Sequence, residues 1–166
     1  MKYLFIVAHP DDESLGAGGT IYNLVRKGNE ITVCVLCGKA EARKVTDNIN
    51  NVQQQLRKSL DILGVSNVIC GDFPNIKFNT VPHIEIVKFI EEAIIKVQPD
   101  IVITHYSNDL NSDHKITSEC CDEAIRYFQR NENIKPIKKY MYMEVLSSTD
   151  WVINNCFHPR SDTVHL

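Results

Sequence analysis

Strand-like and helix-like segments alternate along almost the whole chain, and this alternation constrains the fold more than any other feature. Apolar runs of strand length occur at residues 2–8, 30–37, 67–70, 99–105 and 139–145. Between them, the residues favour helices over 12–27, 52–63, 82–97 and 114–129. Strands that alternate with helices pair in parallel, because each helix carries the chain back to the same edge of the sheet. We therefore predict an α/β protein with a doubly wound parallel sheet.

The length and composition are typical of one globular domain. The 166 residues can bury a substantial core and contain no repeat or linker, so we predict a single domain over residues 1–166. The net charge of −3 and the scattered lysines argue against nucleic acid and anionic membrane surfaces as partners. There is no apolar run of membrane-span length and no secretory signal pattern, so we expect no membrane span and a cytoplasmic location.

The six cysteines are expected to be free thiols, since cytosolic chains rarely keep disulfides. Cys34 and Cys37 have C-x-x-C spacing inside an apolar run. Residues three apart on a strand point to opposite faces, so this pair cannot hold one metal ion without a bulge. We predict that both are buried structural thiols.

Two polar clusters follow predicted strands, where ligands bind in this class of fold. Residues 9–14 read HPDDES after the first strand, and residues 108–114 read NDLNSDH after the fourth. If those strands are neighbours, His9, Asp12 and His114 come together as two imidazoles and one carboxylate, a pattern typical of catalytic zinc. The alternative is helix capping, because carboxylates near a helix N-terminus are stabilised by the helix dipole.

The stretch AHPDDE resembles the signature of the PIG-L/LmbE-like family of zinc-dependent N-acetylglucosamine deacetylases. PDIVITHYSNDLNSDH is similar to the second motif of that family, and FPNIKFNTVP and EVLSSTDW are similar to segments of its bacterial members. The resemblance covers residues 2 to 151. It implies a Rossmann-like three-layer fold, with a mostly parallel sheet of about five strands and helices on both faces.

The same resemblance implies His9, Asp12 and His114 as zinc ligands and Asp11 as the general base. Zinc lowers the pKa of its bound water, and a carboxylate beside the ligands can accept that water's proton. The donor set also suits other divalent metals such as Fe²⁺. Asp113 is expected either to orient an imidazole or to cap the following helix.

The chain departs from the family pattern at two places. Asn111 occupies the position of a histidine that helps stabilise the oxyanion in many relatives, and it offers a neutral hydrogen bond instead. The family's later segments have no counterpart, so residues 152–166 are expected to be atypical or shortened. A family arginine also lacks a clear counterpart, with Arg43 and Arg57 as candidates.

Several other polar or aromatic residues have open interpretations. His105 ends a strand and is interpreted mainly as a cap or packing residue. Asp109 either stiffens its loop or touches substrate or a metal ligand. Glu13 is interpreted as a helix-start residue, and Ser148 has no nucleophilic role. Trp151 either lines a sugar pocket or packs in the core.

The resemblance predicts a zinc-dependent hydrolase that removes the N-acetyl group from an N-acetylglucosamine-containing small molecule or conjugate. The alternative is a catalytically impaired metal- and sugar-binding homologue with a regulatory or subunit role. A nucleotide-binding module is disfavoured, because LGAGGT at residues 15–20 lacks the dinucleotide-binding glycine spacing. The expected partner is an N-acetylated amino sugar, and a homo-oligomer is left open.

Overall fold

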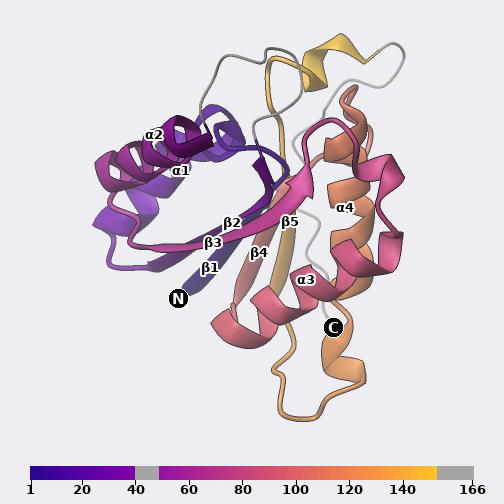
Figure 1. Ribbon diagram of the computed structural model, residues 1–166. Coiled ribbons are helices and arrows are strands. Elements are labelled where there is room, and N and C mark those ends of the chain that lie inside the picture. Colours follow the sequence, from indigo (N-terminus) through magenta and orange to yellow (C-terminus); the bar gives the residue numbers. More distant parts are fainter. Residues whose placement is uncertain (40–48, 153–166) are drawn as a thin grey trace.

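The computed structural model, which describes residues 1–39 and 49–152, contains one five-stranded sheet between helices (Figure 1). The strands are β1 (Lys2–Val7), β2 (Glu30–Lys39), β3 (Asn67–Pro74), β4 (Ile101–His105) and β5 (Lys139–Met143). The helices are α1 (Asp12–Arg26), α2 (Ile49–Leu63), α3 (His83–Val97) and α4 (Ser112–Ala124), with short 3₁₀ turns η1 (Phe78–Thr80), η2 (Tyr127–Gln129) and η3 (Thr149–Trp151). Arg43, Cys156 and the predicted atypical segment after Val152 lie outside the described residues.

All strand pairs in the sheet are parallel, in the order β3-β2-β1-β4-β5. The chain first builds outward from β1 to β3 and then returns to place β4 on the other side of β1. The strand order therefore reverses between β1 and β4, and ligands bind outside the carboxyl ends of the strands at such a point. The predicted α/β, Rossmann-like fold is confirmed, and β1 and β4 are neighbours.

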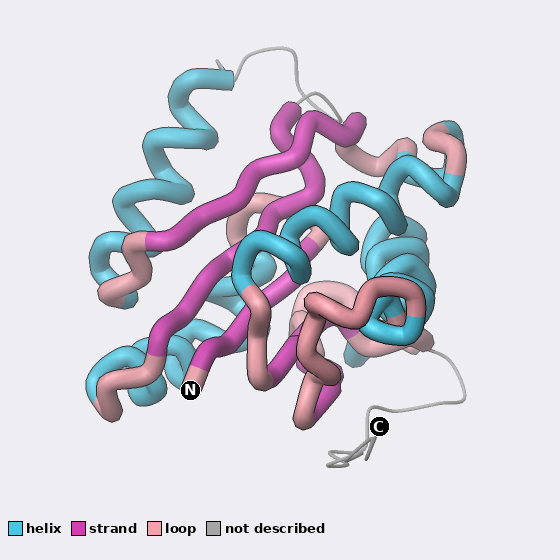
Figure 2. Tube along the Cα trace, turned by 90° about the horizontal axis from the view of Figure 1, so that it is seen from below, coloured by secondary structure: helices cyan, strands magenta, loops and turns pink. Residues whose placement is uncertain are grey.

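Alternating side chains of the strands form one core on each face of the sheet. Leu4 and Ile6 of β1 join the core covered by α3 and α4, while Phe5 and Val7 join the core covered by α1 and α2. Figure 2 shows the two helical layers on opposite sides of the strands. Because the central strands are buried on both faces, their sequences are continuous apolar runs and do not alternate between apolar and polar residues. None of the described helices is long and apolar enough to cross a membrane.

The prediction that Cys34 and Cys37 point to opposite faces is wrong. Both are buried in the core beside α3 and α4. The pairing of β2 with β3 shifts register between Val35 and Cys37, and this irregularity breaks the strict alternation of a flat strand. Both side chains are buried, as predicted.

Some element ends differ from the sequence prediction because the deciding interactions are tertiary. Strand β3 continues to Pro74 alongside β2, beyond the predicted end at Cys70, and β5 ends two residues early, at Met143. Helix α4 ends at Ala124, and η2 replaces its predicted last turn.

Gly16 allows close packing of the backbone near the acidic loop. A Cβ atom there would lie 2.7 Å from the carbonyl oxygen of Glu144, so Gly16 lets α1 lie against the end of β5. Gly18 and Gly19 have no such close neighbour. The contact brings the start of α1 beside the segment that follows β5.

Candidate metal centre

Three side chains converge at the carboxyl edge of the sheet where β1 and β4 lie side by side. His9 comes from the turn between β1 and α1, Asp12 is the first residue of α1, and His114 comes from the first turn of α4. Their facing atoms are His9 Nδ1, Asp12 Oδ2 and His114 Nε2. Within the described part of the chain, this is the group of histidine, cysteine and acidic side chains that could hold a metal ion.

The spacing of these three atoms suits a small cation with tetrahedral coordination. The two histidine nitrogens are 3.3 Å apart, and Asp12 Oδ2 lies 3.4 Å from His9 Nδ1 and 3.3 Å from His114 Nε2. Tetrahedral zinc bonds of about 2.0–2.1 Å place neighbouring ligand atoms about 3.3–3.4 Å apart. Two imidazoles and one carboxylate are also donors that zinc and similar divalent ions accept. The residues therefore fit such an ion.

Each histidine has its outward nitrogen against a second carboxylate. His9 Nε2 is 3.3 Å from Asp113 Oδ2, and His114 Nδ1 is 3.3 Å from Asp109 Oδ1. A carboxylate favours a proton on the nitrogen that faces it, so a neutral imidazole keeps its lone pair on the inward nitrogen. This arrangement prepares both inward nitrogens to bind a cation.

Asp109 is itself held by the segment that follows β5. Ser148 Oγ and Thr149 Oγ1 donate hydrogen bonds to Asp109 Oδ2 at 3.1 and 2.6 Å, and the backbone N–H of Asn111 donates to Oδ1 at 2.8 Å. Of the roles open to Asp109, loop bracing and contact with a predicted metal ligand therefore both occur. Sequence reasoning missed Ser148 and Thr149, because neither spacing nor periodicity links them to His114.

His105 has a larger role in the site than predicted. Its ring is fully buried and stacks on the ring of His114, with centroids 3.9 Å apart and an 11° angle between the planes. Its Nε2 accepts a hydrogen bond from the backbone N–H of Ala8 at 2.9 Å and lies 3.4 Å from Asp12 Oδ2. The available signal was its position at the carboxyl end of a strand beside β1.

The residue that caps the N-terminus of α4 is Asn111, and not Asp113. Asn111 is the N-cap of α4, and its Oδ1 accepts the backbone N–H of Asp113 at 2.9 Å. The alternative in which Asp113 caps the helix is therefore wrong. Asp113 is buried between His9 and the backbone N–H of Phe78, which donates to Oδ1 at 3.2 Å. The capping bond uses the amide oxygen of Asn111, and the two amide hydrogens are the groups that this side chain can donate to a ligand.

Asp11 and Trp151 lie at the surface. The carboxylate of Asp11 is near enough to His9 and His114 for both to influence its pKa. Trp151 is 70% exposed, so the prediction that it packs in the core is wrong.

The pKa value of each residue in the cluster depends on the charges of its neighbours. Burial lowers the pKa of His9, but Asp113 and Asp12 outweigh burial and raise it to about 9. For His114, Asp109 and Asp12 outweigh the same effect and also raise the pKa to about 9. Burial raises the pKa of Asp12, but its contacts with the three histidines hold the pKa well below its usual range. Partial desolvation and the Asp12 charge raise the pKa of the Asp11 carboxyl group to about 6.

We expect metal affinity to increase with pH up to about 9. The pKa values of His9 and His114 are about 9 in the metal-free chain, so a proton must leave each ring before its inward nitrogen can bind. Below that pH, each displaced proton lowers the apparent affinity about tenfold per pH unit. Calorimetric titration with Zn²⁺ between pH 6 and pH 9 in buffers of different ionisation enthalpy measures both the affinity and the released protons. A flat affinity without proton release would contradict this prediction.

The same pKa shifts set the stability of the metal-free protein. Because both pKa values are raised above the unfolded value of 6.5, their stabilising contribution is complete below about 6.5 and is lost as the pH rises to about 9. Chelated protein should therefore melt at a lower temperature at pH 9 than at pH 6.5, and added metal should reverse the difference.

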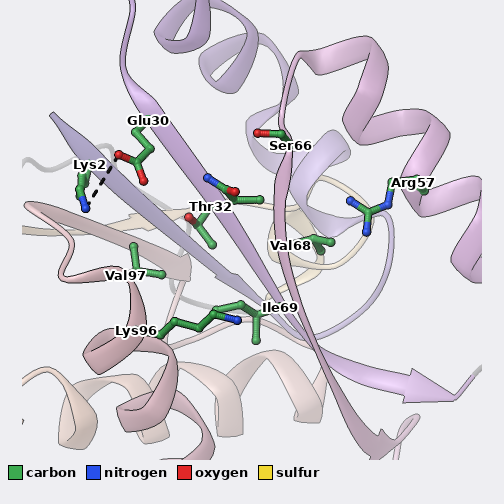
Figure 3. A pocket seen from close by; sticks show the side chains of 10 residues that line it. Lys2, Glu30, Thr32, Arg57, Ser66, Val68, Ile69, Lys96 and Val97 are labelled. Carbon is green, nitrogen blue, oxygen red and sulfur yellow. Dashed lines mark ion pairs between the residues drawn. The ribbon is translucent and has the colours of Figure 1, made fainter.

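A separate pocket of about 290 Å³ lies at the opposite, amino-terminal edge of the strands (Figure 3). Lys2, Arg57 and Lys96 contribute positive charge to its lining, and Lys2 Nζ is 3.9 Å from Glu30 Oε2. Lys96 is in the last turn of α3, where a cation is stabilised by the helix dipole. Except for Arg57, the pocket contains no residue that the sequence singled out for chemistry.

Comparison with known proteins places this site in a family context. The family model described as "PIG-L: GlcNAc-PI de-N-acetylase" matches residues 4–125. A relative from Corynebacterium diphtheriae, 1D-myo-inositol 2-acetamido-2-deoxy-alpha-D-glucopyranoside deacetylase, is 30% identical over 130 residues, which are 63% of this chain and 44% of the relative.

Solved structures share the fold. N,N'-diacetylchitobiose deacetylase from Pyrococcus horikoshii has a TM-score of 0.73 and 20% identity, over 87% of this chain and 60% of the deacetylase. GalB, the 4-carboxy-2-hydroxymuconate hydratase from Pseudomonas putida, has a TM-score of 0.62 and 26% identity, over 82% of this chain and 60% of the hydratase. The chain thus spans less than two thirds of the length of each of these proteins.

Proposed function

This chain belongs to the PIG-L family, and from that premise we propose that it is a metal-dependent hydrolase that removes the acetyl group from an N-acetylglucosamine-containing small molecule or conjugate. The convergence of His9 Nδ1, Asp12 Oδ2 and His114 Nε2 at 3.3–3.4 Å supports this function. We propose zinc as the ion, held by these three side chains, with Fe²⁺ as an alternative that the same imidazole and carboxylate donors accept. Zinc bound there would supply a Lewis acid and lower the pKa of a coordinated water.

The remaining chemistry is assigned to side chains around the three ligands. We propose that Asp11 takes the proton of the attacking water and later returns it to the leaving amine. A pKa of about 6 suits this role, because the carboxylate is ionised at neutral pH yet is basic enough to hold a proton during turnover. Asp11 is also exposed, so an approaching substrate can reach it.

Asn111 and Asp113 have supporting roles in this proposal. The amide hydrogens of Asn111 offer a donor to the oxyanion that forms when the acetamide carbonyl is attacked. Because the N-cap interaction fixes the amide oxygen, the orientation of this donor is set by the helix. Asp113 orients His9 through the 3.3 Å contact with Nε2.

The direct test measures acetate release from N-acetylglucosamine compounds by purified protein. The panel contains free N-acetylglucosamine, its 1-O-inositol and 1-O-malate conjugates, and diacetylchitobiose. Protein stripped with a chelator and reloaded with Zn²⁺ or Fe²⁺ should release acetate from at least one compound, and the stripped protein should not. If the metal binds but no compound is cleaved, the chain is better described as a catalytically impaired metal- and sugar-binding homologue.

The similarity to GalB favours hydration as a second candidate reaction. That hydratase is 26% identical to this chain over an alignment that covers 82% of this chain and 60% of the hydratase. A base beside a cation-binding cluster can activate water for addition to a carbon–carbon double bond as well as to an amide. Loss of ultraviolet absorbance from a conjugated hydroxymuconate, without acetate release from the sugar panel, would favour this reaction.

A further inference from the structure

The backbone of Asp11 has a conformation that side chains rarely adopt. Its φ is 147° and its ψ is −24°. A residue with a Cβ atom enters this region at an energetic cost, and the conformation persists only where the surroundings hold it. The structure should therefore contain specific contacts that fix this peptide.

Glu13 makes such a contact on the amino side of Asp11. Its Oε2 accepts the backbone N–H of Asp11 at 3.1 Å, and its Oε1 accepts a hydrogen bond from Ser14 Oγ at 2.7 Å. Ser14 Oγ is in turn 2.7 Å from Ser59 Oγ, so the contact continues to α2. On the carboxyl side, the carbonyl oxygen of Asp11 accepts the N–H groups of Ser14 and Leu15 at 3.0 and 2.9 Å. The peptide is fixed from both sides.

The burial of Glu13 indicates that this contact is specific. The side chain is 0% exposed, although it lies in the first turn of a helix, where a carboxylate is easily kept in water. Burying such a group costs free energy unless hydrogen bonds replace its hydration. The hydrogen bonds described for it come from Asp11 and Ser14.

The arrangement resembles half of a capping box, but Glu13 is the second residue of α1, whereas the glutamate of a capping box is the third. In the complete motif, the N-cap side chain also binds a backbone N–H of the first turn. Here the N-cap residue is Asp11, and its side chain makes no capping hydrogen bond. Glu13 accepts the backbone N–H of this N-cap residue, and the Asp11 carboxylate is not engaged in capping the helix.

We propose that Glu13, anchored through Ser14 to Ser59 of α2, is a positioning residue that holds the Asp11 peptide in its strained conformation and so aims the Asp11 carboxylate at the site. The inference rests on the proposed function in one respect, namely that Asp11 is the base. Without the clamp, the peptide between His9 and Asp12 would relax and the carboxylate would turn away, while the metal ligands would stay in place.

The first test measures stability and needs no activity. Asp11→Gly should raise the melting temperature, because glycine adopts a φ of 147° without strain. In a Glu13→Ala background the same change should raise it by less, because the peptide is already free to relax. An equal increase in both backgrounds would show that Glu13 does not hold this conformation.

The second test measures kinetics and metal affinity in the same variants. Glu13→Ala should lower kcat on the order of 10–100-fold, as expected for a misaimed base, with KM and the Zn²⁺ Kd unchanged. Glu13→Gln should restore kcat, because its amide oxygen accepts the same N–H and its amide hydrogens can face Ser14. Ser59→Ala should have a smaller effect in the same direction. The matched control, Ser66→Ala, changes an exposed serine at the other edge of the sheet.

Two results would overturn the positioning role: a normal kcat in Glu13→Ala, or a loss of metal affinity as large as the loss of kcat. If the unmodified protein cleaves no compound in the panel, the proposed function fails. The melting-temperature comparison still decides whether Glu13 clamps Asp11.

Discussion

Asp11→Asn should lower kcat about 10²–10⁴-fold while the protein keeps its metal, because the change removes a general base and no ligand. Asparagine has nearly the same shape as aspartate and leaves the hydrogen bonds of the backbone at residue 11 in place, so the fold and the strained turn should survive. The Zn²⁺ Kd, measured by calorimetry, should stay within a few-fold of the unmodified value. The remaining activity should also lose its dependence on a group with a pKa of about 6.

Two outcomes would contradict the role of Asp11. Full turnover in Asp11→Asn would show that another group accepts the proton. A parallel loss of metal would show that Asp11 belongs to the ligand set, which the grouping of His9, Asp12 and His114 does not predict. Asp72→Asn, a change to a carboxylate in β3 on the far side of β2, provides a matched control.

His114→Ala should abolish acetate release by removing one of the three proposed ligands. Loss of an outer partner of a metal ligand costs about 10–100-fold in affinity or activity, so loss of the ligand itself should cost more. The change also removes the imidazole that lies between the buried carboxylates of Asp12 and Asp109, and breaking a buried pair costs about 3–5 kcal/mol. Calorimetry with Zn²⁺ and thermal melts measure the two effects.

Asp109→Asn provides the graded comparison for this ligand. It retains a side chain that can brace the loop but removes the charge against His114 Nδ1, so affinity should fall by only about 10–100-fold. His114→Gln keeps a polar side chain and serves if the alanine variant does not fold. Zinc affinity that is equal in the unmodified, Asp109→Asn and His114→Gln proteins would exclude this site.

The parts of the fold that follow from local pattern were predictable. Strands β1 and β4 are uninterrupted apolar runs because helices cover both faces, and the same rule placed the chemistry at their carboxyl ends. The convergence of His9, Asp12 and His114 was predictable because His9 and Asp12 follow β1 closely and His114 ends the polar loop that follows β4. The faces of Cys34 and Cys37 were not, because a register shift between strands is a property of the pair.

The supporting residues of the site were harder to predict for a physical reason. Ser148 and Thr149 contact Asp109 only because β5 pairs with β4 and the segment after β5 folds back over the site. His105 needs the same sheet order, since its ring meets Asp12 across the β1–β4 pair. Such contacts depend on which strands are neighbours, and a single sequence does not encode that order as a local signal.

His9 and His114 are 105 positions apart in the sequence. An ion bound by both would therefore cross-link the N-terminal segment to a much later part of the chain. An unfolded chain seldom closes so long a loop, so a cation that needs both rings binds almost exclusively to the folded form. Free metal above its Kd would then raise the free energy of unfolding, by about 2.7 kcal/mol at 100 times Kd, and the melting temperature would rise with metal concentration. Removal of the ion would therefore lower the melting temperature and, under the proposed function, the activity together.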